Sequence, residues 1–132
     1  MSAKRFLKVG VLTLSLVALP SAAYAVNVSS NDGSGTQSRT GSLSNGGATV
    51  TGSLRSTTGN TVYYAGRIQL PCGADDNTGR YSSNTSSTSL VTRGGSIQGT
   101  FLHSCAADGV KSRICKVNNN LPDGCGSDSL LY

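Results

Sequence analysis

The sequence predicts an all-β fold, a small antiparallel sandwich or partly open barrel with two disulfides and a flexible N-terminal arm. The first observation is composition: the chain has no Glu, no Trp and one Met, whereas Ser, Thr, Gly and Asn dominate. Glu and Met favour helices, whereas Thr and Tyr favour strands and Gly and Asn favour turns. The second is the alternation of apolar and polar residues over 61–70, which is typical of a strand with one buried face. The third is the set of four cysteines in a chain that begins like an exported protein.

Residues 1–25 have the pattern of a secretory signal peptide. Three basic residues precede a short apolar run over 9–19, and Ala23-Tyr24-Ala25 matches the small-x-small pattern that signal peptidase cuts. The run is too short to span a bilayer, which needs roughly 20 residues. We therefore expect cleavage near Ala25, a secreted, extracellular or periplasmic product, and no transmembrane segment in the mature chain.

Cleavage would lower the formal net charge from +5 to +2, because three of the 11 basic residues lie in the leader. The other basic residues are scattered along the chain, and only Lys111, Arg113 and Lys116 lie close together. A nucleic-acid-binding surface needs a denser basic stripe. The sequence therefore predicts no nucleic-acid partner.

The mature chain divides into an arm over 26–48 and a disulfide-bonded β domain over 49–132. Between Val28 and Val50 the only large apolar residue is Leu43. Such a polar segment buries too little surface to offset its ordering entropy. We expect a flexible arm, with a loosely held first strand as the alternative.

The first confident strands cover 48–55 and 61–70, and the polar loop 56–60 between them predicts a hairpin. In the second strand Val62, Tyr64 and Ile68 share the buried face. A short strand is expected to begin at 90–92, and Arg93-Gly94-Gly95 is expected to turn the chain.

A second hairpin is expected from strands over 96–105 and 110–117, joined by the turn 106–109. In that register Phe101 faces Ile114, and Cys115 points to the opposite face of its strand. A short helix over 106–116 is the alternative. The tail after residue 128 is apolar enough to dock on the body of the domain.

The four cysteines are Cys72, Cys105, Cys115 and Cys125, and in an exported chain an even number indicates disulfides. Cys72 and Cys105 continue the buried faces of their strands, whereas Cys115 lies on an outward face. We therefore predict the pairs Cys72–Cys105 and Cys115–Cys125. The chain has no C-x-x-C pair, and the spacings do not match a zinc site, so neither a metal nor a cofactor is expected.

Candidate functional residues are few. His103 is the single histidine, but no G-x-S-x-G motif accompanies it, so a structural role is favoured over catalysis. The acidic loop around 73–79 is better explained as a polar turn than as a calcium site. Tyr63 and Tyr81, with Arg67, are the candidate ligand contacts, because aromatic and basic side chains on a flat face suit a sugar or a peptide.

These observations favour a non-enzymatic, secreted binding or interaction protein whose partner is an unknown extracellular protein or glycan. One alternative is a structural cell-surface, matrix or filament component that donates the 26–48 arm as an added strand. The other is a small secreted hydrolase that uses His103.

Overall fold

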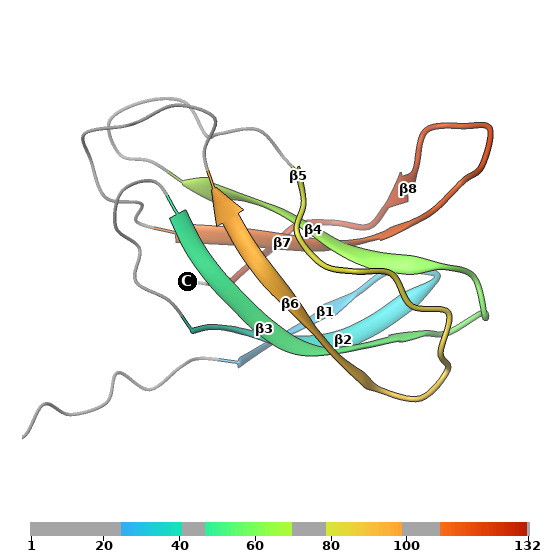
Figure 1. Cartoon of the computed structure of the whole chain (residues 1–132), viewed down its shortest axis with the longest axis horizontal. Coiled ribbons are helices and arrows are strands. Elements are labelled where there is room, and N and C mark those ends of the chain that lie inside the picture. The colour runs from blue at the N-terminus through green and yellow to red at the C-terminus, as the bar shows by residue number, and fades with distance from the viewer. Residues whose placement is uncertain (1–24, 41–46, 70–78, 99–108, 132) are drawn as a thin grey trace, which may run out of the picture.

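The computed structural model describes residues 25–40, 47–69, 79–98 and 109–131, which contain nine strands and no helix (Figure 1). The strands are β1 (Ala25–Ser29), β2 (Gly33–Arg39), β3 (Gly47–Ser56), β4 (Val62–Gln69), β5 (Gly79–Arg80), β6 (Val91–Gln98), β7 (Gly109–Lys116), β8 (Gly124–Cys125) and β9 (Ser129–Leu130). The prediction of an all-β fold is confirmed. Of the predicted leader over 1–25, residues 1–24 lie outside the described residues, and Ala25 is the first residue of β1.

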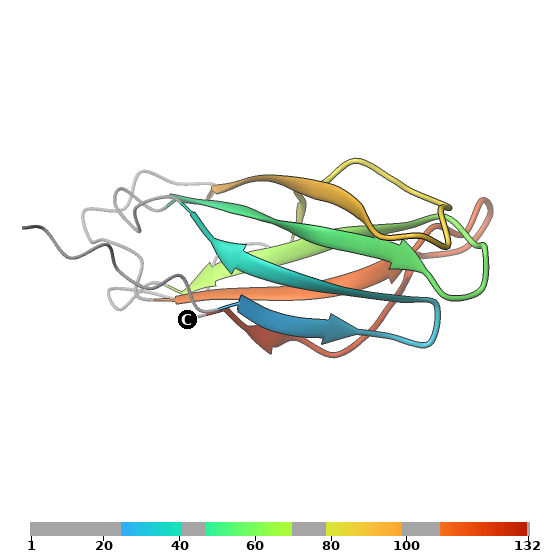
Figure 2. The ribbon, with the colours of Figure 1, turned by 90° about the horizontal axis from the view of Figure 1, so that it is seen from below.

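The strands form two antiparallel sheets that pack face to face and do not close into a barrel (Figures 1 and 2). The first sheet has the order β1-β2-β3-β6. The second has the order β5-β4-β7-β8, and β9 also pairs with β7. Of the two predicted architectures, the sandwich is therefore the one observed.

The predicted hairpin between the first two confident strands is wrong, although both strands form where expected. β3 pairs with β2 and β6 in the first sheet, whereas β4 pairs with β5 and β7 in the second. Each strand has an apolar face, and two apolar faces can be buried across a sandwich as well as side by side. Alternation along a strand marks its buried face but does not identify its neighbour.

The register predicted for the second hairpin involves residues 99–105, which lie outside the described residues. Both edges of β7 are occupied at Ile114: Tyr64 of β4 pairs with it on one side, and the Gly126 N–H donates to its carbonyl on the other at 2.9 Å. The helix alternative fails over 109–116, which is β7, and residues 99–108 lie outside the described part of the chain.

The expected turn at 93–95 is instead the middle of β6, where Gly94 and Gly95 pair with Thr51 and Val50 of β3. A Cβ added to Gly94 would lie 2.3 Å from the Val50 carbonyl oxygen. Glycine is needed at this position because the backbones of β3 and β6 approach closely, and close backbone approach, like a turn, is a common reason for glycine in a sequence.

Much of the segment expected to be a flexible arm is built into the first sheet. Residues 25–39 form β1 and β2, and β2 pairs with β3 along its whole length. Val28 and Gln37 point inward and are 1% and 0% exposed. The hydrogen bonds of the sheet and the close approach of its backbone to the neighbouring strands hold this segment in place. It therefore needs few apolar residues, and its outward-facing positions are polar.

Two apolar clusters fill the space between the sheets. One is formed around Val50, Ile68 and Leu131 and the other around Leu54, Tyr64 and Ile114, and Tyr81 packs against both. Leu131 is 2% exposed, so the C-terminal tail docks as predicted. A smaller cluster of Tyr63, Ala65 and Cys115 lies on β4 and β7 apart from the other two.

Candidate functional site

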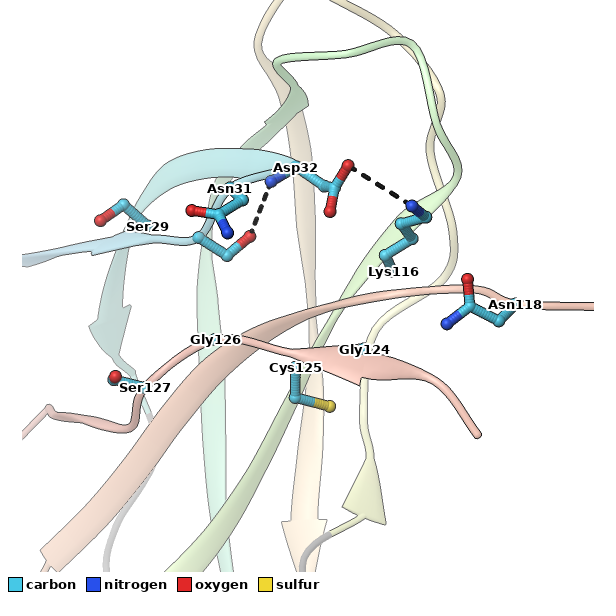
Figure 3. A pocket seen from close by; sticks show the side chains of 10 residues that line it. Ser29, Asn31, Asp32, Lys116, Asn118, Gly124, Cys125, Gly126 and Ser127 are labelled. Atoms are coloured by element: carbon cyan, nitrogen blue, oxygen red, sulfur yellow. Dashed lines mark hydrogen bonds and ion pairs between the residues drawn. The ribbon is translucent and has the colours of Figure 1, made fainter. Parts of the chain in front are cut away.

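A polar pocket of about 690 Å³ lies where the β1–β2 turn faces the end of β7 and the β8 segment (Figure 3). The turn contributes Ser29, Asn31 and Asp32. The opposite wall contributes Lys116, Asn118 and Ser127, together with the backbone of β8. The lining is therefore made of hydroxyl, amide and peptide groups and one pair of opposite charges.

The first wall is held by hydrogen bonds within and around the β1–β2 turn. The hydroxyl oxygen of Ser30 accepts from the backbone N–H groups of Asp32 at 3.3 Å and Gly33 at 3.1 Å. Thr57 donates its N–H to the Asp32 carbonyl at 2.9 Å and its hydroxyl to the Asn31 carbonyl at 3.0 Å. The turn is thus tied to the β3–β4 connection, which fixes the positions of its side chains.

The second wall is held by a disulfide between Cys115 and Cys125, which are directly opposite each other in β7 and β8. The predicted pairing of these two cysteines is confirmed. Beyond the disulfide, the Asn118 side chain donates to the Pro122 carbonyl at 3.0 Å. Cys72 and Cys105 lie outside the described residues, so their predicted bond stays a prediction.

The two walls meet at Gly126. A Cβ added to this residue would lie 2.7 Å from the Cβ of Ser30 and 3.1 Å from the Ser29 carbonyl oxygen. Glycine is the residue that allows this approach, and the contact closes one side of the pocket.

Asp32 is the charged centre of the pocket. Its Oδ1 accepts hydrogen bonds from Asn60 Nδ2 at 3.0 Å and Thr58 Oγ1 at 3.1 Å, and lies 3.8 Å from Lys116 Nζ. The Asn60 hydrogen bond is the main cause that lowers the pKa of Asp32, with Thr58 and Lys116 adding to it and desolvation opposing it. The carboxylate is therefore ionised at neutral pH. All these contacts are to Oδ1, so Oδ2 keeps its lone pairs for a ligand donor.

Tyr63 and Arg67, two of the predicted ligand contacts, lie on the outer face of the second sheet, away from this pocket. The Tyr63 hydroxyl donates to Asp123 Oδ2 at 2.6 Å, and the Arg80 guanidinium lies 4.4 Å from the centre of the Tyr63 ring. Burial, reinforced by Asp123, raises the pKa of Tyr63 to about 12. On the same face, Arg67 Nη2 lies 3.4 Å from Asp128 Oδ2.

Tyr81, the third predicted contact, lies between the sheets and not on that outer face. Its ring is stacked on Tyr64 with a centroid distance of 6.2 Å, and its hydroxyl bonds to Gln37 and Ser112. Arg80, one residue earlier, faces outward and covers Tyr63. The three predicted residues therefore do not form one site. His103 and the loop around 73–78 lie outside the described residues.

The pocket was not foreseen in the sequence. Asp32 lies in an Asn/Asp/Gly/Ser run, which is ordinary turn chemistry. Its partner Lys116 is 84 positions further along the chain, and no local pattern connects them. In the part of the chain that the structure describes, no three His, Cys, Asp or Glu side chains gather as a metal site would require.

No protein-family model, curated protein or solved structure matches the chain. Within the described ranges, no helix has the length and apolar character needed to cross a membrane.

Proposed function

We propose that this protein is an exported, non-enzymatic binding protein, and that the pocket beside Asp32 holds an uncharged ligand rich in hydroxyl groups, such as a short neutral oligosaccharide. The observation that carries the proposal is the polar lining of a pocket whose two walls are each fixed by covalent or hydrogen bonds. A pocket of about 690 Å³ is within the range of small-molecule sites.

The charge of the pocket favours a neutral ligand. Asp32 and Lys116 largely cancel each other, so the site has no excess of either sign. Asp32 Oδ2 accepts hydrogen bonds, whereas the Ser29 and Ser127 hydroxyls both donate and accept. Neighbouring hydroxyls of a sugar likewise both donate and accept hydrogen bonds, so they can pair with these groups of the pocket.

The direct test is an array of neutral and acidic oligosaccharides, followed by calorimetric titration of any neutral sugar that binds. Asp32→Asn keeps the size of the side chain and an oxygen that can accept from Thr58 and Asn60, but removes the charge. We expect affinity to fall at least tenfold, because a hydrogen bond to a charged group is worth roughly 1.5–3 kcal/mol.

Asp128→Asn is the matched control, because it makes the same chemical change at the Arg67 ion pair on the outer face of the second sheet. This variant should bind the sugar like the parent protein. Equal loss of affinity in both variants, or an array on which no neutral sugar binds, would contradict the proposal.

A filament component remains the second candidate, and one observation favours it. Within the described residues, β6 is an eight-residue strand at the edge of the first sheet with no strand on its outer side. Exposed edges of this kind pair with other chains. The donor strand predicted from the sequence is less suitable, because 25–29 already pair with β2 and 33–39 with β3. Size-exclusion chromatography with light scattering at rising concentration should show growing assemblies, and a monomer throughout would exclude this candidate.

A further inference from the structure

The sulfur atoms of the Cys115–Cys125 disulfide lie on the opposite side of β8 from the pocket beside Asp32. Cys115 is 1% exposed and packs with Tyr63 on the outer face of the second sheet. Cys125 is directly opposite Cys115 in the ladder, so its side chain points to the same face. Cys125 is exposed, and Figure 3 shows its sulfur pointing away from Asp32. A reagent in solution can therefore reach this residue without entering the pocket.

Few noncovalent bonds hold β8 to the rest of the sheet. The strand covers only Gly124–Cys125, and β7 is its one neighbour among the described strands. Beyond it, the Gly126 N–H donates to the Ile114 carbonyl at 2.9 Å. Before it, the Tyr63 hydroxyl donates to Asp123 at 2.6 Å. Short edge elements of this kind open locally at a small free-energy cost, so the disulfide is the main restraint on this segment.

Displacement of the segment would remove one wall of the pocket. Residues 124–127 are four of the ten that line it. Gly126 is also the point where the two walls meet, against Ser29 and Ser30. The β1–β2 turn has its own hydrogen bonds to Thr57 and would stay in place. The position of β8 therefore decides whether the pocket is complete.

We propose that this disulfide is a redox switch for the pocket: a dithiol reductant opens the pocket by freeing residues 124–127, and the oxidised form of the same reagent closes it again. The proposal rests on the binding function proposed for the pocket. Reductant and ligand act on opposite sides of β8, so they do not compete for one surface. Each favours a different position of the same segment, and the two events are therefore thermodynamically coupled.

The exchange begins at the exposed cysteine. A thiolate of the dithiol attacks the Cys125 sulfur, the bond between the two cysteines breaks, and Cys115 leaves as a thiolate that takes up a proton. The second thiol of the reagent then attacks the mixed disulfide and releases Cys125 as a thiol. The protein gains two electrons and two protons, and the reagent loses them as it becomes a disulfide. Exposed disulfides are the ones that exchange in this way most readily.

The first test follows the segment itself. The oxidised protein is treated with dithiothreitol, and alkylation with peptide mapping identifies the reduced cysteines. Reduction of Cys115 and Cys125 should speed amide hydrogen exchange in residues 124–127 at least tenfold, while β3 and β4 keep their protection. Unchanged exchange in this segment would mean that β8 does not need the disulfide. Loss of protection throughout both sheets would mean that the disulfide supports the whole fold, and either result would overturn the proposal.

The second test measures the coupling. Calorimetric titrations use the neutral trisaccharides maltotriose, cellotriose and mannotriose with the oxidised and the reduced protein. The affinity for any sugar that binds should fall at least tenfold on reduction. By reciprocity, a saturating amount of that sugar should make the disulfide harder to reduce by the same factor, and tenfold corresponds to about 30 mV for a two-electron couple. Equal affinities in the two redox states would contradict the switch.

Cys115→Ala with Cys125→Ala is the matched control, because it keeps Cys72 and Cys105. This variant should bind the sugar as weakly as the reduced parent protein, and dithiothreitol should not change its affinity. A further fall on treatment would assign the effect to Cys72 and Cys105 and would also overturn the proposal. If the variant does not fold, the reduced parent protein still decides.

Failure of the switch can be told apart from failure of the pocket. If the oxidised protein binds no neutral sugar, the function proposed for the pocket is wrong. The hydrogen-exchange test needs no ligand, so it decides in either case whether reduction frees residues 124–127.

Discussion

The hydroxyl of Tyr81 donates a hydrogen bond to the side-chain oxygen of Gln37 in the middle of the core, where the two sheets face each other. The hydroxyl of Ser112 reaches the same oxygen at 2.6 Å. Gln37 belongs to β2 and Ser112 to β7, so these three residues join the first sheet to the second. Polar groups this deep are costly unless they are paired, and here they specify how the sheets align.

Removing the Tyr81 hydroxyl should destabilise the fold. We expect Tyr81→Phe to lower the free energy of unfolding by about 1–2 kcal/mol, because Gln37 and Ser112 each lose a buried partner. Tyr63→Phe is the control, since the Tyr63 hydroxyl bonds to the exposed Asp123 and its loss should cost less. Denaturant unfolding measures both, and a larger loss in the control would contradict this role for the Tyr81–Gln37 hydrogen bond.

Gly35 makes room for another bond between the sheets, from the Tyr64 hydroxyl to the Ser53 carbonyl at 2.5 Å. A Cβ at position 35 would lie 1.9 Å from the Ser53 oxygen and 2.0 Å from the Tyr64 hydroxyl oxygen. Gly35→Ala should therefore cost at least 1–3 kcal/mol of stability, as overpacking usually does. Gly79→Ala is the matched control, because no atom lies within 4 Å of its added Cβ. Equal melting temperatures of the two variants would disprove the steric argument.

The Cys115–Cys125 disulfide closes a loop with a sequence separation of 10. In the chain-entropy account, a loop of this size contributes about 3 kcal/mol to stability. Replacing both cysteines by Ala should lower the free energy of unfolding by roughly that amount and loosen the β8 wall of the pocket. Thermal unfolding would show the first effect, and sugar titration would show the second.

Peptide mapping of the non-reduced protein should recover these two cysteines in one cross-linked fragment. Recovery of Cys115 joined to Cys105 would refute the structure at this point.

Tyrosine ionisation should limit stability at high pH. Burial raises the pKa of Tyr81 to about 12, opposed by its hydrogen bonds to Ser112 and Gln37, and burial with Asp123 raises that of Tyr63 to about 12. In the unfolded chain both titrate near 10. The stabilising effect of the neutral forms is therefore complete below pH 10 and is lost as the pH rises towards 12. Phenolate absorbance should appear together with unfolding in this window, and titration of Tyr81 near pH 10 in the folded protein would contradict the prediction.

The strands themselves could be predicted because the signals for them are local. The alternation of apolar and polar residues located β3 and β4 to within about one residue. Cys115 and Ile114 point to opposite faces of their strand, and this difference led to the correct disulfide. Pairing could not be predicted in the same way. β3 and β4 are consecutive and similar in pattern, yet they lie in different sheets, because the energy of burying an apolar face depends on what covers it and not on sequence distance.

The candidate sites were less accessible to sequence reasoning than the strands. Tyr63 and Tyr81 were both predicted to contact a ligand from the same face, but one side chain faces outward and the other lies between the sheets. Arg67 and Arg80 are scattered in the sequence, away from the cluster that contains Lys111 and Arg113, and only the β5–β4–β7 register brings the four together.

The sequence by itself determined that the chain is all-β and that Cys115 bonds to Cys125. These features depend on residue preferences, on the alternation of apolar and polar residues, and on the face of a strand to which a side chain points, all of which are properties of neighbouring residues. Only the tertiary structure decided which strands pair, that Asp32 meets Lys116, and that Arg67 and Arg80 share one face with Lys111 and Arg113. These relationships join residues tens of positions apart, and they arise from the packing of whole sheets, which no local pattern records.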